Sequence, residues 1–484
     1  MQNNHSDSRS SPCGPSAGRH ALAARFLAWD ATGSLPRLFL LLGCPLGLLF
    51  AFLVAPLQVP DEMAHLYRAY ALSGGSCLAP LHLTVPAALS QLQDAFPPNV
   101  EAVRSVHFRD YLALLHPPRQ GGEVQIANVS ANIYNCAPYL LSGAGVAIAR
   151  LFAQPPIVLF FAARLLNLAF YLALVYVALR IIPAGRLTLF CLALMPMTLH
   201  QAASVSADSP AFATAFLFFA YVLYLALDPR LSAVSTRRFA TAGALLLFAS
   251  LCKFNLWFCL LLLLIPAARL GSLQRKLLAI ALVCGAILLA AALCQFLNRP
   301  NLAAFAAARA RDNIFPPQNA AFILHQPLAF ARILLRTWQV KSSMYAIEFV
   351  GTLGWLAIDV PDWLVFSWFA LLAATALFAA QVRLTLAQRA LCALTAIAAF
   401  VSVFVLLWTI ELRQEHLLAD MLGSTAALVP AVQGRYFITL APPLLLALSG
   451  RRMRVRPAIP VAICAAFVLV SAAVALTRVF GAYY

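Results

Sequence analysis

Long apolar runs, separated by short segments rich in arginine, are the feature that most limits how this sequence can fold. A helix that crosses the hydrocarbon core of a bilayer needs roughly 17–25 mainly apolar residues, and such runs recur from residue 36 to residue 479. Hydrophobic residues make up 62% of the chain and charged residues only 11%, whereas a soluble domain carries about 25% charged residues. The sequence therefore predicts an all-α, multi-pass membrane protein.

We expect about eleven membrane-spanning helices from the length of these runs. The candidate spans are 36–56, 157–179, 187–203, 209–227, 239–252, 254–268, 277–297, 363–382, 390–410, 435–449 and 458–479. The runs 239–252 and 254–268 are both short. They can also be taken as one long span, which would invert the topology of everything that follows.

The distribution of basic residues favours two spans in that region. Short cytoplasmic loops collect lysine and arginine. With two spans, the basic loops 180–186, 228–238, 269–276 and 383–389 and the cluster 451–456 all fall inside, whereas a single span would place the last cluster outside. The amino end is then cytoplasmic and the carboxyl end lies outside. The net charge of +17 does not indicate nucleic acid, because the basic residues lie between apolar runs and not on one compact face.

This topology divides the chain into a tail and one membrane domain. Residues 1–35 are polar and are expected to form a disordered cytoplasmic tail, and residues 36–479 form the membrane domain, with outer loops at 57–156, 298–362 and 411–434. The apolar segment 137–152 is expected to lie in the membrane interface. Most carboxylates fall outside, which indicates either a functional outer face or simply the polar character of long loops.

Two cysteines stand apart from the rest. In the predicted topology Cys77 and Cys136 lie in the first outer loop, whereas the others lie in spans or in the tail. In an oxidising compartment such a pair can form a disulfide, which we expect here. No Cys-x-x-Cys or Cys/His spacing typical of a metal site is present in the sequence.

The segment PDEMAHLYRAYALSGG directly follows the first span. Pro60 suits the first turn of a helix, and Asp61 and Glu62 then sit at the positive end of its dipole. His65 and Arg68 follow at helical spacing on the same face as Asp61. The segment is either a charged functional face at the membrane surface or a capped surface helix with local ion pairs.

Further candidates lie late in the chain. Lys253 separates two short apolar runs, where a charge is costly and tends to be functional, unless it snorkels to the interface. Arg435, followed by Tyr436, opens a late span and leaves the same alternatives open. His200 and Asp208 flank the outer ends of spans, and a structural role is expected for both.

The PDEMAHLYRAYALSGG segment resembles the bacterial membrane proteins of domain-of-unknown-function family 2142. The segment QGRYF at 433–437, followed by Pro442 and Pro443, looks like the second signature of that family. The resemblance covers most of the chain, from about residue 36 to residue 479. The architecture in turn resembles the GT-C glycosyltransferases, which use lipid-phosphate-linked sugars.

This second resemblance implies specific roles. GT-C enzymes place an acidic pair just after the first span, where Asp61 and Glu62 stand, and such carboxylates can also hold a divalent cation, Mg²⁺ or Mn²⁺. The apolar segment 137–141 looks like their interfacial segment before the second span, and 204–208 resembles the polar outer end of their third span.

We therefore expect a membrane glycosyltransferase at the outer face of the bacterial inner membrane. It would transfer a sugar from a polyprenyl-phosphate-linked donor to a glycan or lipid acceptor of the cell envelope, with Asp61 as the preferred base. The expected substrate-binding residues are His65, Arg68, Lys253, Arg435 and Tyr436. The alternatives are a transporter or flippase of lipid-linked glycans, for which inverted repeats would be expected, and a non-catalytic scaffold for envelope assembly.

Overall fold

The structure is a computed structural model that describes residues 31–97, 106–115, 121–127, 129–253, 255–378, 384–421, 427–450 and 458–484. Most of the expected tail 1–35 and the basic cluster 451–456 lie outside the described residues. Residues 31–35, which were assigned to the tail, instead form the start of the first described helix.

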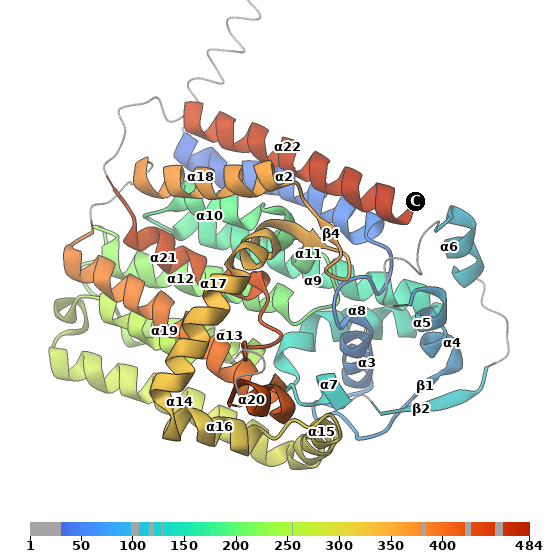
Figure 1. Cartoon of the computed structure of the whole chain (residues 1–484). Helices are drawn as coiled ribbons and strands as arrows, with labels where there is room; N and C mark the ends of the chain where they lie inside the picture. Colours follow the sequence, from blue (N-terminus) through green and yellow to red (C-terminus); the bar gives the residue numbers. More distant parts are fainter. Residues whose placement is uncertain are drawn as a thin grey trace, which may run out of the picture.

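Helices dominate the described residues (Figure 1). The long helices are α2 (Ala31–Leu53), α9 (Pro156–Ile181), α12 (Asp208–Leu227), α13 (Thr236–Cys252), α14 (Leu273–Leu297), α17 (Pro327–Gly351), α18 (Asp362–Phe378), α19 (Leu386–Glu411) and α22 (Ala458–Tyr483). The shorter ones are α3 (Glu62–Ser73), α4 (Ala87–Ser90), α5 (Leu92–Ala95), α6 (Phe108–Leu115), α7 (Val129–Asn132), α8 (Leu140–Leu151), α10 (Arg186–Ala193), α11 (Pro196–Ala202), α15 (Arg299–Arg311), α16 (Pro316–His325), α20 (Gln414–Met421) and α21 (Ala441–Ala447). The 3₁₀ helices are η2 (Ala137–Tyr139), η3 (Leu256–Leu264), η4 (Ala267–Leu270) and η5 (Gly434–Phe437).

Strands play a minor part. Strands β1 (Leu83–Pro86) and β2 (Glu123–Ile126) pair antiparallel within the first outer loop. Strands β3 (Thr352–Leu353) and β4 (Ile358–Asp359) form a second antiparallel pair directly after α17. The second pair packs against α11, α17 and α22, with Leu353 buried in the core, but both pairs are short, so the fold is all-α in its architecture.

Six helices of the described part are long and apolar enough to cross a membrane: α2 from Ser34, α9, α12, α14, α19 and α22. Helix α12 is central and packs against α9 and α13, whereas α14 lies at the edge and exposes leucines such as Leu278, Leu282 and Leu289. Exposed leucines of this kind are stable against lipid rather than water. These features support the predicted class of multi-pass membrane protein, while the count of eleven spans stays a prediction.

The expected span 187–203 is a broken helix. Helix α10 ends at Ala193, and α11 begins at Pro196, which lacks the N–H that a continuing helix would need. The carbonyl of Ala193 accepts a hydrogen bond of 2.7 Å from the Tyr171 hydroxyl of α9. A neighbouring helix thus satisfies a backbone group that the break would leave unpaired within the bilayer.

Segment 239–268 passes along the bundle twice. Helix α13 ends beside the first outer loop, where the Asn135 side-chain amide donates to the carbonyl of Leu251 at 2.8 Å. The chain then returns through η3 to η4, where Arg269 donates to the carbonyls of Leu225 (2.7 Å) and Asp228 (2.9 Å) at the far end of α12. A 3₁₀ helix rises about 2.0 Å per residue, so a short segment covers the distance. The chain thus runs along the bundle in both directions within this segment, and the assignment of two membrane spans to it stays a prediction.

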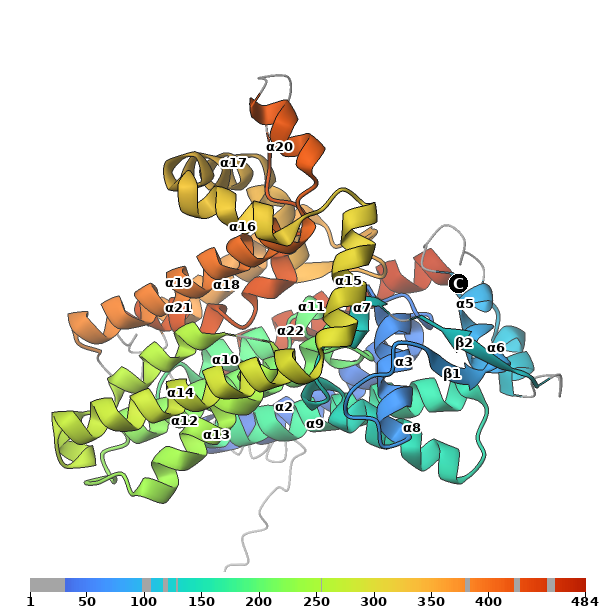
Figure 2. The same ribbon diagram turned by 90° about the horizontal axis from the view of Figure 1, so that it is seen from below.

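The second outer loop, expected at 298–362, is not irregular, because α15, α16 and α17 fold within it. Helix α17 lies across the direction of the bundle helices (Figure 1), and α16, α17 and α20 stand together on one side of the bundle in Figure 2. The Asn298 side chain donates to the carbonyl of Asn132 (2.8 Å), and that of Asn301 donates to the carbonyl of Ala79 (2.8 Å). The start of α15 is thereby attached to the first outer loop.

Segment 137–152 forms η2 and α8, which packs along the start of α9. Gly145 makes this close packing possible, because a Cβ atom there would come within 2.5 Å of the carbonyl oxygen of Ala162. Helices α2, α13, α14, α19 and α22 all end, and α9, α12 and α18 begin, toward the side of the bundle that carries the first outer loop. We call this side the outer end, since the predicted topology places it outside.

Candidate functional site

Asp61 stands just after α2, at the residue that precedes α3. Its backbone is left-handed, with φ 63° and ψ 10°, a conformation that is uncommon for residues other than glycine but that aspartate tolerates. The side chain is exposed and makes no hydrogen bond that caps the helix. The local backbone thus holds an exposed carboxylate at the outer end of the bundle.

Glu62 points elsewhere. Its carboxylate is fully buried against Arg164 of α9, accepting hydrogen bonds from Nε (2.8 Å) and Nη2 (2.7 Å). Its Oε1 also accepts the Val205 N–H at 2.9 Å. The structure therefore does not bring Glu62 together with Asp61, because the Glu62 oxygens are engaged in a buried brace between α3, α9 and the turn before α12.

A charged cluster forms around Asp208, the first residue of α12. The Lys253 ammonium pairs with Asp208 Oδ1, and Arg435 Nε lies 3.6 Å from Asp208 Oδ2. The Tyr436 ring lies under both cations, with its centroid 4.7 Å from Lys253 Nζ and 5.5 Å from Arg435 Cζ. The cluster residues come from distant parts of the sequence. Asp208 begins α12, Lys253 directly follows α13, and Arg435 and Tyr436 lie in η5.

His65 connects this group to α3. It is buried, and its Nδ1 lies 2.7 Å from the Tyr139 hydroxyl. Burial lowers the pKa of His65 to about 4, opposed by the charges of Asp61 and Asp208 and assisted by those of Lys253 and Arg435. The imidazole is therefore neutral at pH 7. We use the name charged cluster for Asp61, His65, Asp208, Lys253, Arg435 and Tyr436.

Arg68 does not belong to the charged cluster. It is fully buried and donates hydrogen bonds to the carbonyls of Ser76 (3.2 Å) and Cys77. A disulfide joins Cys77 to Cys136, the residue that directly precedes η2, in which Tyr139 lies. Arg68 and the disulfide thus hold the first loop against α3, and the structure does not bring Arg68 together with Lys253 and Arg435.

Arg435 is the most unusual member of the charged cluster. Only 5% of its surface is exposed, yet its Nε and Nη1 make no hydrogen bond to any described residue. Its nearest carboxylate, Asp208, is shared with Lys253. Buried guanidinium donors without partners are costly, so the geometry favours an anionic group that completes their hydrogen bonds.

The expected metal pair does not fit a divalent cation. The Glu62 carboxylate faces a guanidinium and a backbone N–H, neither of which leaves room for a cation on the same oxygens. Within the described residues, no three histidine, cysteine or acidic side chains gather as metal ligands would. No chemical step is therefore assigned to a metal held by Asp61 and Glu62.

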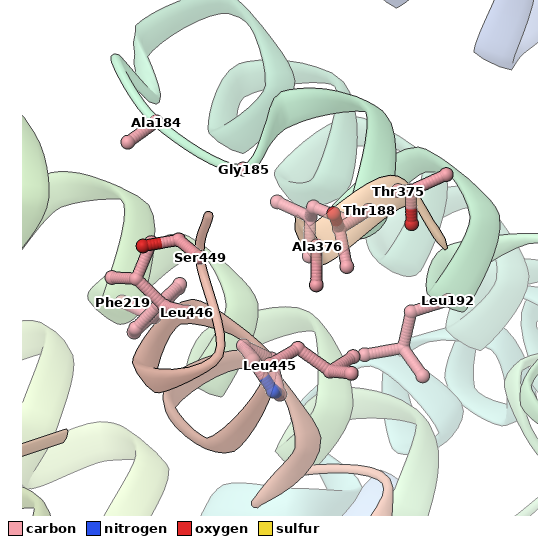
Figure 3. Close-up of a pocket in the computed structure, with 12 residues that line it drawn as sticks. Ala184, Gly185, Thr188, Leu192, Phe219, Thr375, Ala376, Leu445, Leu446 and Ser449 are labelled. Carbon is pink, nitrogen blue, oxygen red and sulfur yellow. The ribbon is translucent and has the colours of Figure 1, made fainter. Parts of the chain in front are cut away.

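A small cavity lies away from the charged cluster, between α10, α18 and α21 (Figure 3). It has an empty volume of about 450 Å³, including the space at its mouth, and is lined mainly by apolar side chains such as Leu192 and Leu446. The hydroxyls of Thr188 and Ser449 line it and have no hydrogen-bond partner in the described part of the chain. Two hydroxyls in a small apolar cavity suit an ordered water, and none of the cluster residues reaches it.

Four residues near the charged cluster have no assigned place in the site on the sequence alone. They are Asp208, for which a structural role is expected, Arg164, Tyr139, and Glu348, which accepts a hydrogen bond from the Gly434 N–H next to Arg435. Arg164 carries a usable signal, since a charge inside the apolar run 157–179 is rare unless it is buried with a partner. Tyr139 and Glu348 carry no such signal, because their partners come from distant segments.

Comparison with known proteins agrees with the resemblance at the level of the family. The model of the family described as predicted membrane protein (DUF2142) matches residues 44–444, which include both sequence signatures and all members of the charged cluster. Neither the curated proteins nor the solved structures contain a match to the chain. The chain belongs to the DUF2142 family of predicted membrane proteins.

Proposed function

We propose that this protein is a membrane glycosyltransferase that takes its sugar from a polyprenyl-phosphate-linked donor at the outer end of the bundle. The observation that carries the proposal is the charged cluster itself. It combines an exposed carboxylate, Asp61, with two cations, Lys253 and Arg435, that share a single acidic partner. Glycosyl transfer from a lipid phosphate needs a base for the acceptor and positive charge for the leaving group.

In this proposal Asp61 accepts the proton of the acceptor hydroxyl. The acceptor oxygen attacks the anomeric carbon of the donor sugar and forms the new glycosidic bond. The bond between that carbon and the phosphate oxygen breaks, and its electron pair stays on the phosphate. A single displacement of this kind inverts the configuration at the anomeric carbon.

Lys253 and Arg435 would receive the charge of the departing polyprenyl phosphate. Arg435 Nη1 has no hydrogen-bond partner among the described residues, and Nε contacts Asp208 only through the longer ion pair, so both are donors that match phosphate oxygens. Asp208 holds both cations at one place before the donor arrives. His65, neutral and hydrogen-bonded to Tyr139, lies close enough to Asp61 and to both cations for their charges to act on it.

The alternative of a transporter has one observation in its favour, the break between α10 and α11. Discontinuous helices are common at the substrate sites of secondary transporters. Here, however, the carbonyl at Ala193 is already satisfied by Tyr171, and the charged cluster lies at helix ends. Transfer remains the better explanation of a cluster in that position.

A transfer assay tests the proposal. The purified protein in detergent or nanodiscs is incubated with radiolabelled polyprenyl-phosphate sugars and a membrane extract that supplies acceptors. Asp61→Asn should lower the rate by about 100-fold or more, because general-base catalysis contributes about 10²–10⁴-fold.

The matched control is Asp94→Asn, which removes an exposed carboxylate from α5 of the same loop. It should transfer sugar at the wild-type rate. Equal rates for Asp61→Asn and the wild type, or the absence of transfer from every lipid-phosphate sugar, would contradict the proposal.

A further inference from the structure

We propose that Glu348 of α17 is a positioning residue that holds Arg435 and Tyr436 in the charged cluster by anchoring Gly434. The inference rests on the proposed function for the role of Arg435, and on the geometry of α17 and η5 for the anchor itself. Glu348 belongs to neither sequence signature, and within the described part of the chain it makes no hydrogen bond or ion pair with a member of the charged cluster.

Gly434 sits directly against the backbone of α17. A Cβ atom at this position would come within 2.0 Å of the Tyr345 carbonyl oxygen and 2.6 Å of the Phe349 nitrogen. Backbone atoms cannot move aside as a flexible side chain can. Glycine is therefore required here, because the approach is too close for any side chain.

Glu348 fastens this contact. Its Oε2 accepts the Gly434 N–H at 2.6 Å, and the side chain is buried, with only 7% of its surface exposed. Gly434 is the first residue of η5, so its N–H has no partner within the helix. The residue before it, Gln433, makes no capping hydrogen bond with its side chain. A carboxylate from a distant helix thus takes the place of a local cap.

The anchor determines where the next two side chains go. Arg435 and Tyr436 follow Gly434 within the single turn of η5, and both reach the cluster through that turn. Phe437, the last residue of η5, packs edge-to-face on Tyr345 of α17, with ring centroids 5.8 Å apart. The turn is therefore held at both ends by α17, and its middle carries the two residues that face Lys253 and Asp208.

Three variants test the inference: Glu348→Ala, which removes the acceptor; Glu348→Gln, which keeps an acceptor oxygen without charge; and Asp359→Asn as the control. Asp359 is an exposed carboxylate near the end of α17, so its variant removes the same charge without touching Gly434. Two measurements are made on full-length protein in detergent. One is hydrogen–deuterium exchange of peptides that cover 427–440, and the other is the Kd of farnesyl phosphate, a sugar-free lipid phosphate.

Glu348→Ala should speed amide exchange in 427–440 by about tenfold or more and weaken farnesyl phosphate binding by about tenfold, since the lost bond is to a charged acceptor. Glu348→Gln should show an exchange rate and a farnesyl phosphate Kd close to those of the wild type, and Asp359→Asn should leave both quantities unchanged. Restoration by glutamine separates a positioning role from a purely electrostatic one. The thermal unfolding midpoint of each variant shows that the bundle is intact.

The two proposals fail in different ways. If Glu348→Ala leaves both exchange and binding unchanged, or if glutamine restores neither, the positioning role is overturned. If the wild type binds no farnesyl phosphate while the exchange pattern is as expected, the lipid-phosphate function fails and the anchoring of η5 by Glu348 stands.

Discussion

The Glu62–Arg164 brace makes a strong prediction about stability. All five N–H donors of Arg164 are used: three bond the carbonyls of Ala51, Val54 and Ala55 at the end of α2, and two bond Glu62. Both side chains are fully buried. Glu62→Gln keeps the shape but removes the charge, and its amide group would turn a donor toward a donor. Removing one partner of a buried ion pair lowers the free energy of unfolding by about 3–5 kcal/mol. We expect Glu62→Gln to lower it by an amount at the lower end of that range.

The measurement is equilibrium unfolding by denaturant in detergent micelles, followed by tryptophan fluorescence. The control is Glu411→Gln, which breaks the ion pair with Arg309, because those side chains are 21% and 25% exposed. Solvent screening makes that pair weaker, and its loss should cost about 1 kcal/mol or less. The double variant Glu62→Leu/Arg164→Leu should lose less than the sum of its single variants, because neither charge is then left alone.

One result would refute this reasoning. If Glu62→Gln unfolds at the wild-type denaturant concentration while sugar transfer falls as far as in Asp61→Asn, then Glu62 acts in the reaction and not as a brace.

Three further predictions follow from single features. His65 has a pKa lowered to about 4 in the folded protein by burial, against 6.5 for the free side chain, so its contribution to stability is complete above about pH 6.5 and is lost as the pH falls toward 4. The free energy of unfolding should fall by about 3 kcal/mol over this interval, and that of His65→Gln should change less with pH than that of the wild type. Parallel plots of unfolding free energy against pH for the two proteins would contradict the prediction. Mass spectrometry of the unreduced protein should find Cys77 linked to Cys136, and replacing both by serine should lower stability by about 2–4 kcal/mol; free thiols at both positions would exclude the bond. A reporter fused after Arg186 should be cytoplasmic and one near Arg119 external, and a cytoplasmic signal near Arg119 would overturn the predicted orientation.

The membrane class and the positions of the long apolar helices follow from the sequence alone. The apolar runs 157–179, 209–227 and 277–297 correspond to α9, α12 and α14 within a few residues. Hydropathy acts over about 20 consecutive residues, so a span is visible without knowledge of its neighbours. The break in 187–203 was not predicted, because the run is mainly apolar; the structure shows that the helix ends at Ala193 and begins again at Pro196.

The second outer loop was less accessible from the sequence. Residues 327–351 form α17, but this segment carries Arg332, Arg336, Lys341 and Glu348 and therefore does not resemble a span. A helix of this composition is stabilised mainly by packing against its neighbours. Its contacts with η5, α11, α16 and α18 show that it belongs to the folded bundle.

The sequence placed Asp61, Lys253 and Arg435 at span ends, but it did not determine their partners. Asp61 and Glu62 are adjacent in the chain but lie in different surroundings. Asp61 has a left-handed backbone and stays exposed before α3, whereas Glu62 is buried because Arg164, 102 positions away, binds its carboxylate. The local sequence shows where helices lie and which charged residues stand at their ends. Which charges meet depends on how helices distant in the sequence pack, since desolvation makes each buried charge stable only where another element supplies its partner.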